Sequence, residues 1–439
     1  MATTRRPRSG PQRSTGLAQR SAPPFDPLQL SADEQVTEPH VLLLGQPGTG
    51  KSAWAKCIVA RLLRSGAGGP RHVGIVDPKG EYGALAEAVG LGHVRLYPGG
   101  PHRLNPLDAG PSACVGWAVT ADRRHAILAG LCTASLGRAL STAEDRALAA
   151  VVPGLAPPGQ RQPVLFDVVR LLAEPTADMI GWAASEAAAD ECFEWGSVVA
   201  PGELVGAARH LGHALGRLLD RELHGCFDAA TTVGIDGDGP GVVVDLSAFH
   251  TRRSALPLAV MASMAWIESA QALATAEAAK ATDEAASGVF TGAPGQFPRR
   301  YNVVDEAWAV MGHEHASSYV EAWLDRAAVD GAANILIAHC LHDLGWGPDD
   351  AEALSKRARA FVGAFGTRLV FRQSLDDAEL ARAALDLRKD EAAAITYLGR
   401  GQALWNVRLG AASVVGVPVQ GEIGPDEWAF CDGPHTLSV

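Results

Sequence analysis

Short runs of consecutive apolar residues recur along the chain, and the first two are each followed by a segment with helical spacing. The first run, residues 40–44, precedes a glycine-rich turn and a stretch, residues 52–63, whose apolar positions recur at helical intervals. Residues 71–77 form the next run and residues 82–90 the next helical stretch. Continuous apolar runs are typical of parallel strands buried on both faces. Strands that alternate with helices at this spacing predict a doubly wound, mostly parallel α/β sheet.

The pattern changes near residue 109. Residues 109–223 are rich in Ala and Leu at helical spacing and have almost no strand signal, and Ser141 and Glu144 form a capping box that predicts the start of one helix. Apolar strand patterns then return in four places, at residues 242–246, 301–305, 334–338 and 368–372. The economical interpretation is one α/β domain that is interrupted by an all-helical insertion.

These patterns divide the chain into four parts. We expect the α/β core at residues 36–110 and 240–420 and the helical insertion at residues 111–239. Residues 1–35 are predicted to be a disordered tail, because the five arginines before Asp26 lie among Pro, Ser, Gly and Gln with no hydrophobic period. An inert solvated tail is the preferred interpretation, and a polyanion-binding arm is the alternative. Residues 421–439 are predicted to be a C-terminal tail.

Composition narrows the class of protein. Of the 439 residues, 47% are hydrophobic and 20% charged, as in ordinary globular proteins. The longest apolar stretch, residues 255–267, is shorter than the roughly 20 residues of a membrane-spanning helix. The seven cysteines are scattered without a CxxC spacing, which argues against a disulfide framework and a cysteine zinc site. The net charge of −11 argues against nucleic-acid binding over the whole surface. Together these features predict a soluble cytoplasmic protein.

A glycine-rich motif follows the first apolar run. Its eight residues are Gly45, Gln46, Pro47, Gly48, Thr49, Gly50, Lys51 and Ser52. They match the P-loop pattern, and the expected strand and helix flank them. Glycines allow backbone N–H groups to surround phosphate oxygens at the start of a helix. Lys51 is therefore predicted to reach the β- and γ-phosphates of ATP, and the Ser52 hydroxyl to bind Mg²⁺.

An acidic pair ends the apolar run near residue 304. Asp305 is predicted to hold the magnesium ion through water, and Glu306, one residue later, to take a proton from the attacking water. An acidic pair at the end of a strand is weak evidence alone, but it gains weight behind a P-loop. The pattern predicts a Walker B element and an ATP hydrolase.

Further motifs carry a family resemblance. Residues 75–82 read Ile-Val-Asp-Pro-Lys-Gly-Glu-Tyr, and residues 104–108 read Leu-Asn-Pro-Leu-Asp. With the P-loop, the Asp-Glu-Ala-Trp sequence at residues 305–308 and the segments 371–373 and 398–401, they resemble the motor domain of conjugative and type IV secretion ATPases. These belong to the FtsK/HerA branch of P-loop proteins, and the resemblance is closest to the VirB-type assembly ATPases.

The resemblance covers nearly all of residues 36–420 and includes a helical insertion at the family's position. It implies a RecA-like core that uses Mg²⁺ with ATP. It also implies a homo-oligomeric ring, usually hexameric, at the cytoplasmic face of a membrane transfer channel. Full-length assembly ATPases carry a large N-terminal domain, whereas about 35 residues precede the core here. We expect that domain to be a separate polypeptide, or this chain to be a motor-only relative.

Asp77, Lys79 and Glu81 lie at the end of a predicted strand beside the P-loop strand. One interpretation puts their charges near the γ-phosphate or a neighbouring subunit. The other makes them a structural turn with solvated charges. The sequence leaves both interpretations open.

The chain departs from the family pattern after the strand at residues 334–338. Ala338-His339 stands where the family usually has a Thr-Gln pair, with Asp343 at the later acidic position. His339 is expected either to hydrogen-bond a γ-phosphate or its water, as glutamine does, or to mark weakened hydrolysis. His339 to Asp343 also read as a metal cluster, but no second pair of ligands has the required spacing, so ordinary strand-end residues are the preferred interpretation.

A second departure concerns arginine. Relatives often carry an arginine-lysine pair about where Ala328-Val329 lie. An arginine from a neighbouring subunit stabilises charge on the transferring phosphoryl group. Arg326, Arg359 and Arg372 are the candidates for that role.

The preferred interpretation is a cytoplasmic ATPase, peripheral at the inner face of the cell membrane. It energises assembly of, or transfer through, a conjugative type IV secretion-like machine. One alternative is a DNA-translocating coupling motor, whose partner is DNA. The other is an ATP-binding assembly subunit that hydrolyses little or no ATP.

Overall fold

The computed structural model describes residues 25–65, 69–108, 117–155, 161–181, 199–234, 239–286, 298–311, 314–329, 331–344, 359–409 and 413–431. Their strands are β1 (Val41–Leu44), β2 (Arg71–Asp77), β3 (Gly92–Arg95), β4 (Gly241–Asp245), β5 (Arg299–Val304), β6 (Ala332–Ala338), β7 (Thr367–Val370), β8 (Gln402–Leu409) and β9 (Ser413–Gln420). They form one nine-stranded sheet in the order β3-β4-β2-β5-β6-β1-β7-β8-β9. From β3 through β7 in this order, every neighbouring pair of strands is parallel. The last two pairs, β7 with β8 and β8 with β9, are antiparallel. The predicted mostly parallel α/β fold is confirmed.

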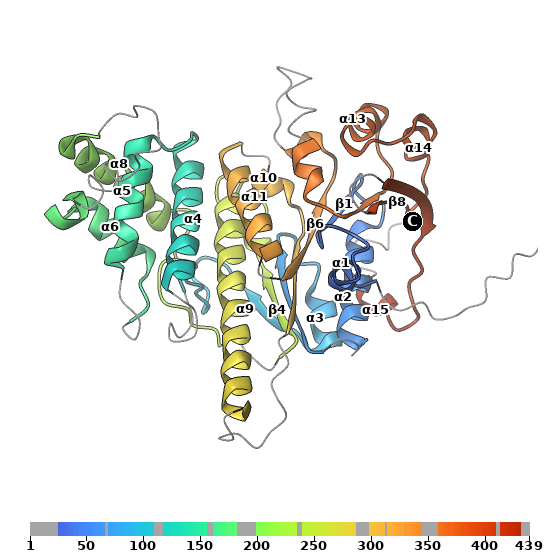
Figure 1. The fold of residues 1–439 in the computed structure, drawn as a ribbon, viewed down its shortest axis with the longest axis horizontal. Coiled ribbons are helices and arrows are strands. Elements are labelled where there is room, and N and C mark those ends of the chain that lie inside the picture. The colour runs from blue at the N-terminus through green and yellow to red at the C-terminus, as the bar shows by residue number, and fades with distance from the viewer. Residues whose placement is uncertain are drawn as a thin grey trace, which may run out of the picture.

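Helices cover both faces of this sheet (Figure 1). They are α1 (Pro27–Ala32), α2 (Lys51–Arg64), α3 (Gly83–Val89), α4 (Trp117–Leu136), α5 (Thr142–Val151), α6 (Leu165–Ala173), α8 (Pro201–Asp220), α9 (Leu256–Ala286), α10 (Trp308–Met311), α11 (Glu314–Val329), α13 (Leu375–Leu385), α14 (Lys389–Ala394) and α15 (Trp428–Cys431). Short 3-10 turns are η1 (Val152–Gly154), η2 (Ser247–Phe249) and η3 (His342–Leu344).

The central strand β1 contributes side chains to the apolar cores on both faces of the sheet. Val41 and Leu43 belong to the apolar core shared with α2 and α3, and Leu42 and Leu44 to the core shared with α9, α10 and α11. Alternate residues of a strand point to opposite faces, so a continuous apolar run fills both cores at once. This is the arrangement that the unbroken apolar pattern predicts.

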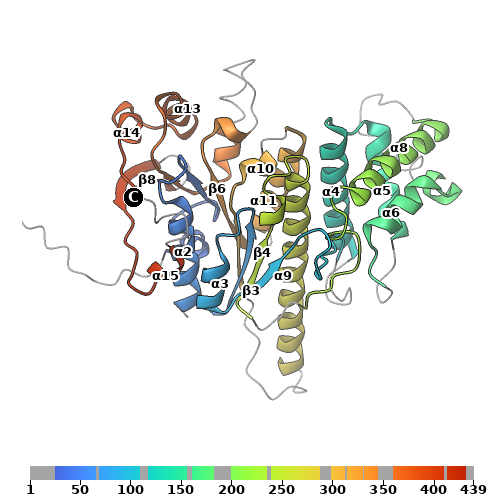
Figure 2. The ribbon, with the colours of Figure 1, turned by 180° about the vertical axis from the view of Figure 1, so that it is seen from behind.

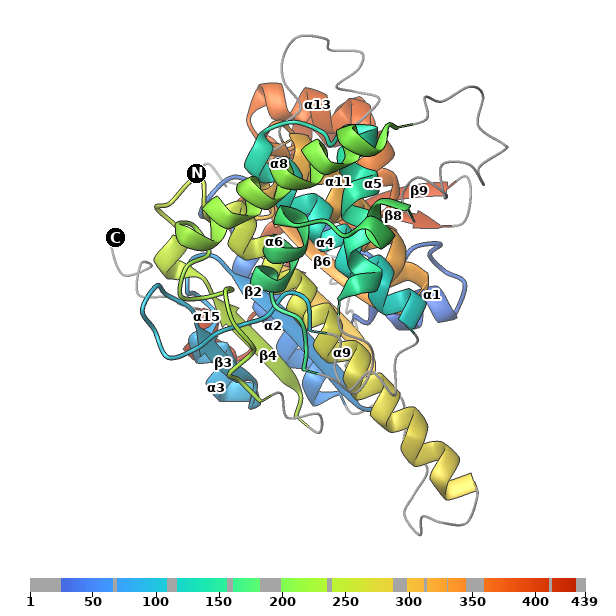
Figure 3. The same ribbon diagram turned by 90° about the vertical axis from the view of Figure 1, so that its left-hand side faces the viewer.

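The predicted insertion range contains only helices among its described residues. α4, α5, α6 and α8 lie together on one side of the sheet, and α4 packs against α9 and α11 (Figures 1 and 2). Their buried residues form one continuous core with that face of the sheet. α9 is 31 residues long and runs past the sheet (Figure 3).

Parts of both predicted tails are structured. Asp26 caps α1, and its carboxylate also binds Arg71 and Arg299 at 3.1 and 3.0 Å and the Tyr301 hydroxyl at 2.8 Å. α15 packs against α2 at the other end of the chain. Residues 25–35 and 421–431 are therefore structured, whereas the arginine-rich residues 1–24 and residues 432–439 lie outside the described residues. No helix in the described ranges is long and apolar enough to cross a bilayer.

Candidate nucleotide-binding site

The P-loop connects β1 to α2, and two of its glycines have backbone conformations that favour glycine. Gly48 and Gly50 have φ angles of 76° and 104°, in the left-handed region that other residues rarely adopt. A Cβ atom at Gly50 would lie 3.2 Å from the backbone nitrogen of Gly401. The glycines thus allow both the tight turn and the close approach of a second segment.

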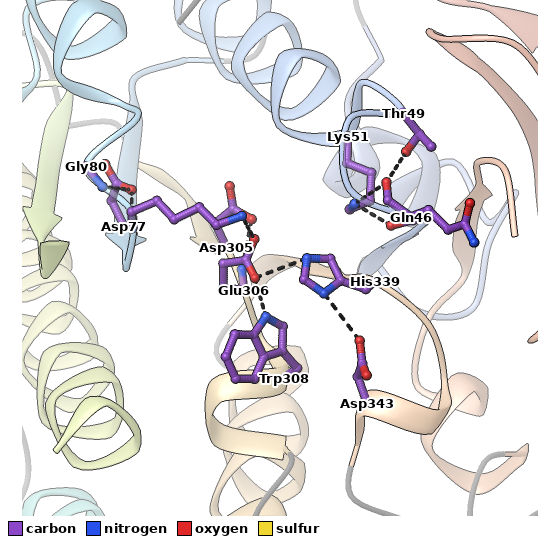
Figure 4. Close-up of polar contacts among 12 residues, drawn as sticks. Gln46, Thr49, Lys51, Asp77, Gly80, Asp305, Glu306, Trp308, His339 and Asp343 are labelled. Carbon is purple, nitrogen blue, oxygen red and sulfur yellow. Dashed lines mark hydrogen bonds and ion pairs between the residues drawn. The ribbon is translucent and has the colours of Figure 1, made fainter. Parts of the chain in front are cut away.

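Lys51 points back into its own loop (Figure 4). Its ammonium donates to the carbonyl oxygen of Gly45 and, at 3.1 Å, to that of Gln46. Thr49 Oγ1 also donates to the Gln46 carbonyl, at 2.7 Å. Burial lowers the pKa of Lys51, and the nearby charges of Asp305 and Glu306 oppose that shift. The lysine is a buried cation held by weak neutral acceptors, which a phosphate oxygen can replace.

Three segments hold the P-loop from its sides. Gly45 N donates to Ala338 O of β6 at 3.2 Å, and Gln46 N donates to Arg372 O after β7 at 3.0 Å. Gly401 N donates to Thr49 O at 2.8 Å. The C-terminal segments 371–373 and 398–401, which contribute to the family resemblance, therefore contact the P-loop directly.

Asp305 lies at the end of β5 and is buried. Its Oδ2 accepts from the Tyr82 hydroxyl at 2.9 Å, and its Oδ1 accepts from Glu306 N at 2.8 Å. Burial and the neighbouring Glu306 carboxylate raise the pKa of Asp305. A buried acidic pair of this kind favours a bound cation. Ser52 and Asp305 offer hydroxyl and carboxylate oxygens, the donors that Mg²⁺ prefers, so the residues fit the predicted metal.

Glu306 is held by three donors around its carboxylate (Figure 4). Oε1 forms an ion pair with Lys79 Nζ, and Oε2 accepts from Trp308 Nε1 and lies 3.3 Å from His339 Nε2. Burial raises the pKa of Glu306, but His339 and Lys79 outweigh burial and lower that pKa to about 2. In this arrangement Glu306 is an ionised and weakly basic group.

His339 lies between two carboxylates. Its Nε2 faces Glu306, its Nδ1 lies 3.3 Å from Asp343 Oδ2, and its ring stacks on Trp308 with centroids 6.2 Å apart. Hydrogen bonds to Asp343 and Glu306 raise the pKa of His339 to about 9. Both ring nitrogens are therefore engaged with protein groups, and His339 acts on Glu306 in this structure.

The sequence 77–82 forms a turn that Asp77 organises. Its buried carboxylate accepts from the backbone nitrogens of Lys79, Gly80 and Tyr82 at 3.2, 2.8 and 2.9 Å. Burial raises the pKa of Asp77 to about 6, although hydrogen bonds from the backbone, that of Tyr82 foremost, act to lower it. The turn directs Lys79 to Glu306 and Tyr82 to Asp305, while Glu81 is half-buried beside it. The structural interpretation fits Asp77, and Lys79 reaches the site.

Two contacts escaped the sequence prediction. Tyr82 and Trp308 were recognised as parts of motifs, without a role in the site. Tyr82 reaches Asp305 because β2 and β5 are neighbours in the sheet, whereas Trp308 contacts Glu306 locally, two residues before it in the chain. An aromatic residue one or two positions after each acidic segment was the available signal.

The candidate arginines lie in different places. Arg326, in the last turn of α11, pairs with Glu268 of α9 at 3.2 Å. Exposed Arg359 donates to the Ala383 carbonyl at 2.8 Å. Arg372 follows β7 beside the P-loop, with its side chain exposed.

Comparisons with known proteins agree with this geometry. Residues 26–133 match the family described as the helicase HerA central domain. The structure is similar to VirB4 of Thermoanaerobacter pseudethanolicus, with a TM-score of 0.58 and 19% identity over 89% of this chain and 91% of that one. The matched residues, which include the P-loop, are thus similar to the HerA central domain, and the fold as a whole is similar to that of VirB4. The bacterial conjugative coupling protein TrwBdeltaN70, in an unbound monoclinic form, is also similar, with a TM-score of 0.50 and 16% identity over 90% of this chain and 92% of that one.

No curated protein matches the chain significantly. The similarity of residues 26–133 to the HerA central domain nevertheless agrees with the FtsK/HerA resemblance that the motifs indicate. Similarity to a P-loop NTPase family implies nucleotide binding.

Proposed function

We propose that the protein is a Mg-ATP hydrolase that works in a homo-oligomeric ring, most simply a hexamer, and energises a conjugative type IV secretion-like machine. The observation that supports hydrolysis is a convergence at one edge of the sheet. Lys51 follows β1, the Asp305-Glu306 pair follows β5, and His339 follows β6, which lies between those two strands. Ligands of open parallel sheets bind at the carboxyl ends of the strands.

Each group has a task in this proposal. Lys51 leaves the Gly45 and Gln46 carbonyls for phosphate oxygens, while the P-loop amides bind the same phosphates. Ser52 and Asp305 would hold Mg²⁺, and the bound ion would neutralise phosphate charge. Glu306 accepts the proton of the attacking water. The base strengthens when Lys79 or His339 moves away from Glu306, because those two cations hold its pKa low.

The class of machine follows from the similar structures and remains a proposal. VirB4 and the conjugative coupling protein share this fold over about nine tenths of the chain. We propose transfer-channel components as partners and the cytoplasmic face of a membrane as the location. The assembly motor is preferred over the DNA-translocating motor, since the net charge of −11 disfavours a DNA-binding surface.

The second candidate function is an ATP-binding subunit that hydrolyses little ATP. The three donors on Glu306, together with His339 in place of the family's glutamine, favour it. His339→Gln separates the two candidates. A gain in kcat supports a base that His339 restrains, whereas a loss supports a hydrolase in which His339 positions Glu306.

The deciding experiment measures steady-state ATP hydrolysis by the purified chain, with and without DNA, over a series of protein concentrations. The proposed hydrolase gives Mg-dependent turnover that Lys51→Ala abolishes. Strong stimulation by DNA would favour the DNA motor. ATP binding without turnover at every concentration would favour the non-hydrolysing subunit.

A further inference from the structure

Three metal-binding side chains lie together beside the nucleotide site. Cys340 and His342 are in the segment after β6, and Asp377 is in the first turn of α13. Their thiol, imidazole and carboxylate ligand atoms all lie within 4.8 Å of one another. The sequence alone disfavoured a metal cluster here, because Asp377 follows His342 by 35 positions and no ligand spacing connects them.

The surroundings of this cluster position its ligands. Asp377 Oδ1 lies 2.8 Å from His342 Nδ1, and its Oδ2 accepts from Ser374 Oγ at 2.5 Å. The backbone nitrogen of Asp377 donates in turn to Ser374 Oγ at 3.1 Å. Hydrogen bonds from neighbouring residues commonly orient carboxylates that bind metals. Cys340 is half-buried, and the His342 side chain is 47% exposed, so one side of the cluster is open to water.

The charges around the thiol are negative. The charged groups that act on Cys340 are the carboxylates of Asp343 and Asp377. A thiolate formed there would be repelled by both carboxylates, and a divalent cation removes that repulsion. The cluster therefore favours a cation over an anionic ligand.

We propose that Cys340, His342 and Asp377 form a binding site for Zn²⁺, with water as the fourth ligand. Sulfur, nitrogen and carboxylate donors suit Zn²⁺, and three protein ligands with one open position is a common zinc arrangement. The thiolate and the carboxylate balance the charge of the ion. The Cys340 proton passes to solvent on binding, and no group is oxidised or reduced.

This site differs from the nucleotide magnesium site in its donors. Mg²⁺ prefers oxygen ligands, and only one of the three side chains supplies oxygen. Zinc would join the segment after β6 to α13. That segment carries His339, whose carbonyl also accepts from Gln373 Nε2 at 3.2 Å. Bound zinc therefore restrains the residue that contacts Glu306.

The test uses cobalt as a spectroscopic substitute for zinc on the metal-free, nucleotide-free full chain without an affinity tag. One equivalent of Co²⁺ should give visible bands of a four-coordinate site and a near-ultraviolet thiolate-to-cobalt band. Zn²⁺ should abolish both, and a large excess of Mg²⁺ should not. Cys340→Ser should remove the thiolate band and lower zinc affinity by about 100-fold or more, with losses of at least about 10-fold for His342→Ala and Asp377→Asn.

Two control variants make the result specific. His224→Ala changes another exposed histidine, and Cys57→Ala changes a buried thiol whose sulfur lies 3.4 Å from that of Cys431. Both should keep the cobalt spectrum. A folded wild-type chain without a thiolate band would overturn the proposal. So would a band that survives Cys340→Ser, or one that Cys57→Ala removes. None of these readouts depends on ATP hydrolysis, so they are independent of the proposed function.

Discussion

Glu306 has a backbone φ of 53°, in the left-handed region that non-glycine residues seldom adopt. Such a conformation costs roughly 1–3 kcal/mol and persists where the surroundings hold it. Here three donors hold the carboxylate, and the backbone nitrogen donates to Asp305. The geometry of this residue keeps its carboxylate beside the buried aspartate, at the point where the proposed water attacks.

Replacing Glu306 and Lys51 should separate catalysis from binding. Glu306→Gln should retain Mg-ATP and lower kcat by about 10²- to 10⁴-fold, because Asp305 still binds the metal while the water loses its base. Lys51→Ala should abolish nucleotide binding, because the phosphates lose their buried cation. Calorimetric binding and steady-state turnover measure the two effects. Unchanged turnover in Glu306→Gln would remove Glu306 from the catalytic role.

His40 should make the stability of the fold depend on pH, independently of the active site. It is buried, its Nε2 donates to Leu324 O at 3.1 Å, and its Nδ1 accepts from Asn334 N at 3.2 Å, which requires the neutral ring. Burial lowers the pKa of His40 to about 4. The unfolded chain takes up a proton below its pKa of about 6.5, and the folded chain takes it up only near pH 4. The contribution of His40 to stability therefore falls as the pH decreases through this window.

His40→Gln keeps a donor and an acceptor but does not titrate. Relative to wild type, its free energy of unfolding should rise by about 2.5 kcal/mol between pH 7 and pH 4.5. Urea unfolding of both proteins at several pH values measures this difference, and the effects of other acidic and basic groups cancel. A difference that is constant with pH would contradict the assignment of a neutral buried imidazole.

At the scale of elements, sequence patterns predicted the central strands and missed the edges. β1 and β2 are buried along their whole length, so their apolar runs are unbroken. β3 buries only Val94 of its four residues, and β8 and β9 form an antiparallel hairpin at the other edge, so neither has that pattern. Edge strands bury one face or less, so their sequences lack the unbroken apolar run that marks a strand buried on both faces.

For the nucleotide site, likewise, the sequence predicted the local motifs but not the contacts between strands. The P-loop and the Asp305-Glu306 pair are local motifs, and each has a defined position relative to one strand. The contacts of Tyr82 and His339 with that pair arise when β2 and β6 come to lie on either side of β5. Sheet order of this kind is a property of the whole fold, and spacing along the chain does not contain it.

The α1 element should contribute to stability through Asp26, although it lies in the predicted tail. Asp26→Asn removes the charge from a buried group that binds Arg71, Arg299 and Tyr301. Loss of one partner in a buried ion pair costs about 3 kcal/mol. Asp33→Asn, at the exposed end of the same helix, is the matched control and should change stability little. Equal unfolding midpoints for the two variants would show that α1 is not anchored by Asp26.

At the scale of the whole molecule, the proposed site has a base, a metal-binding aspartate and a P-loop lysine from one chain. Arg326 forms an ion pair with Glu268 on α9, so its charge is partly neutralised within the subunit. Arg359 and Arg372 have exposed side chains. In the proposed ring, an exposed arginine of one subunit would meet the nucleotide of its neighbour and complete the site.

Turnover per subunit should therefore rise with protein concentration. A dilute subunit binds ATP but lacks the arginine that stabilises phosphoryl charge, a deficit of roughly 10³-fold or more. Single replacement of Arg326, Arg359 or Arg372 by Ala should leave ATP binding intact and depress turnover at one of them. Mixing that variant with Glu306→Gln should partly restore activity, because some interfaces then pair an intact base with an intact arginine. Specific activity that is independent of concentration, without rescue on mixing, would instead indicate a site completed within one chain.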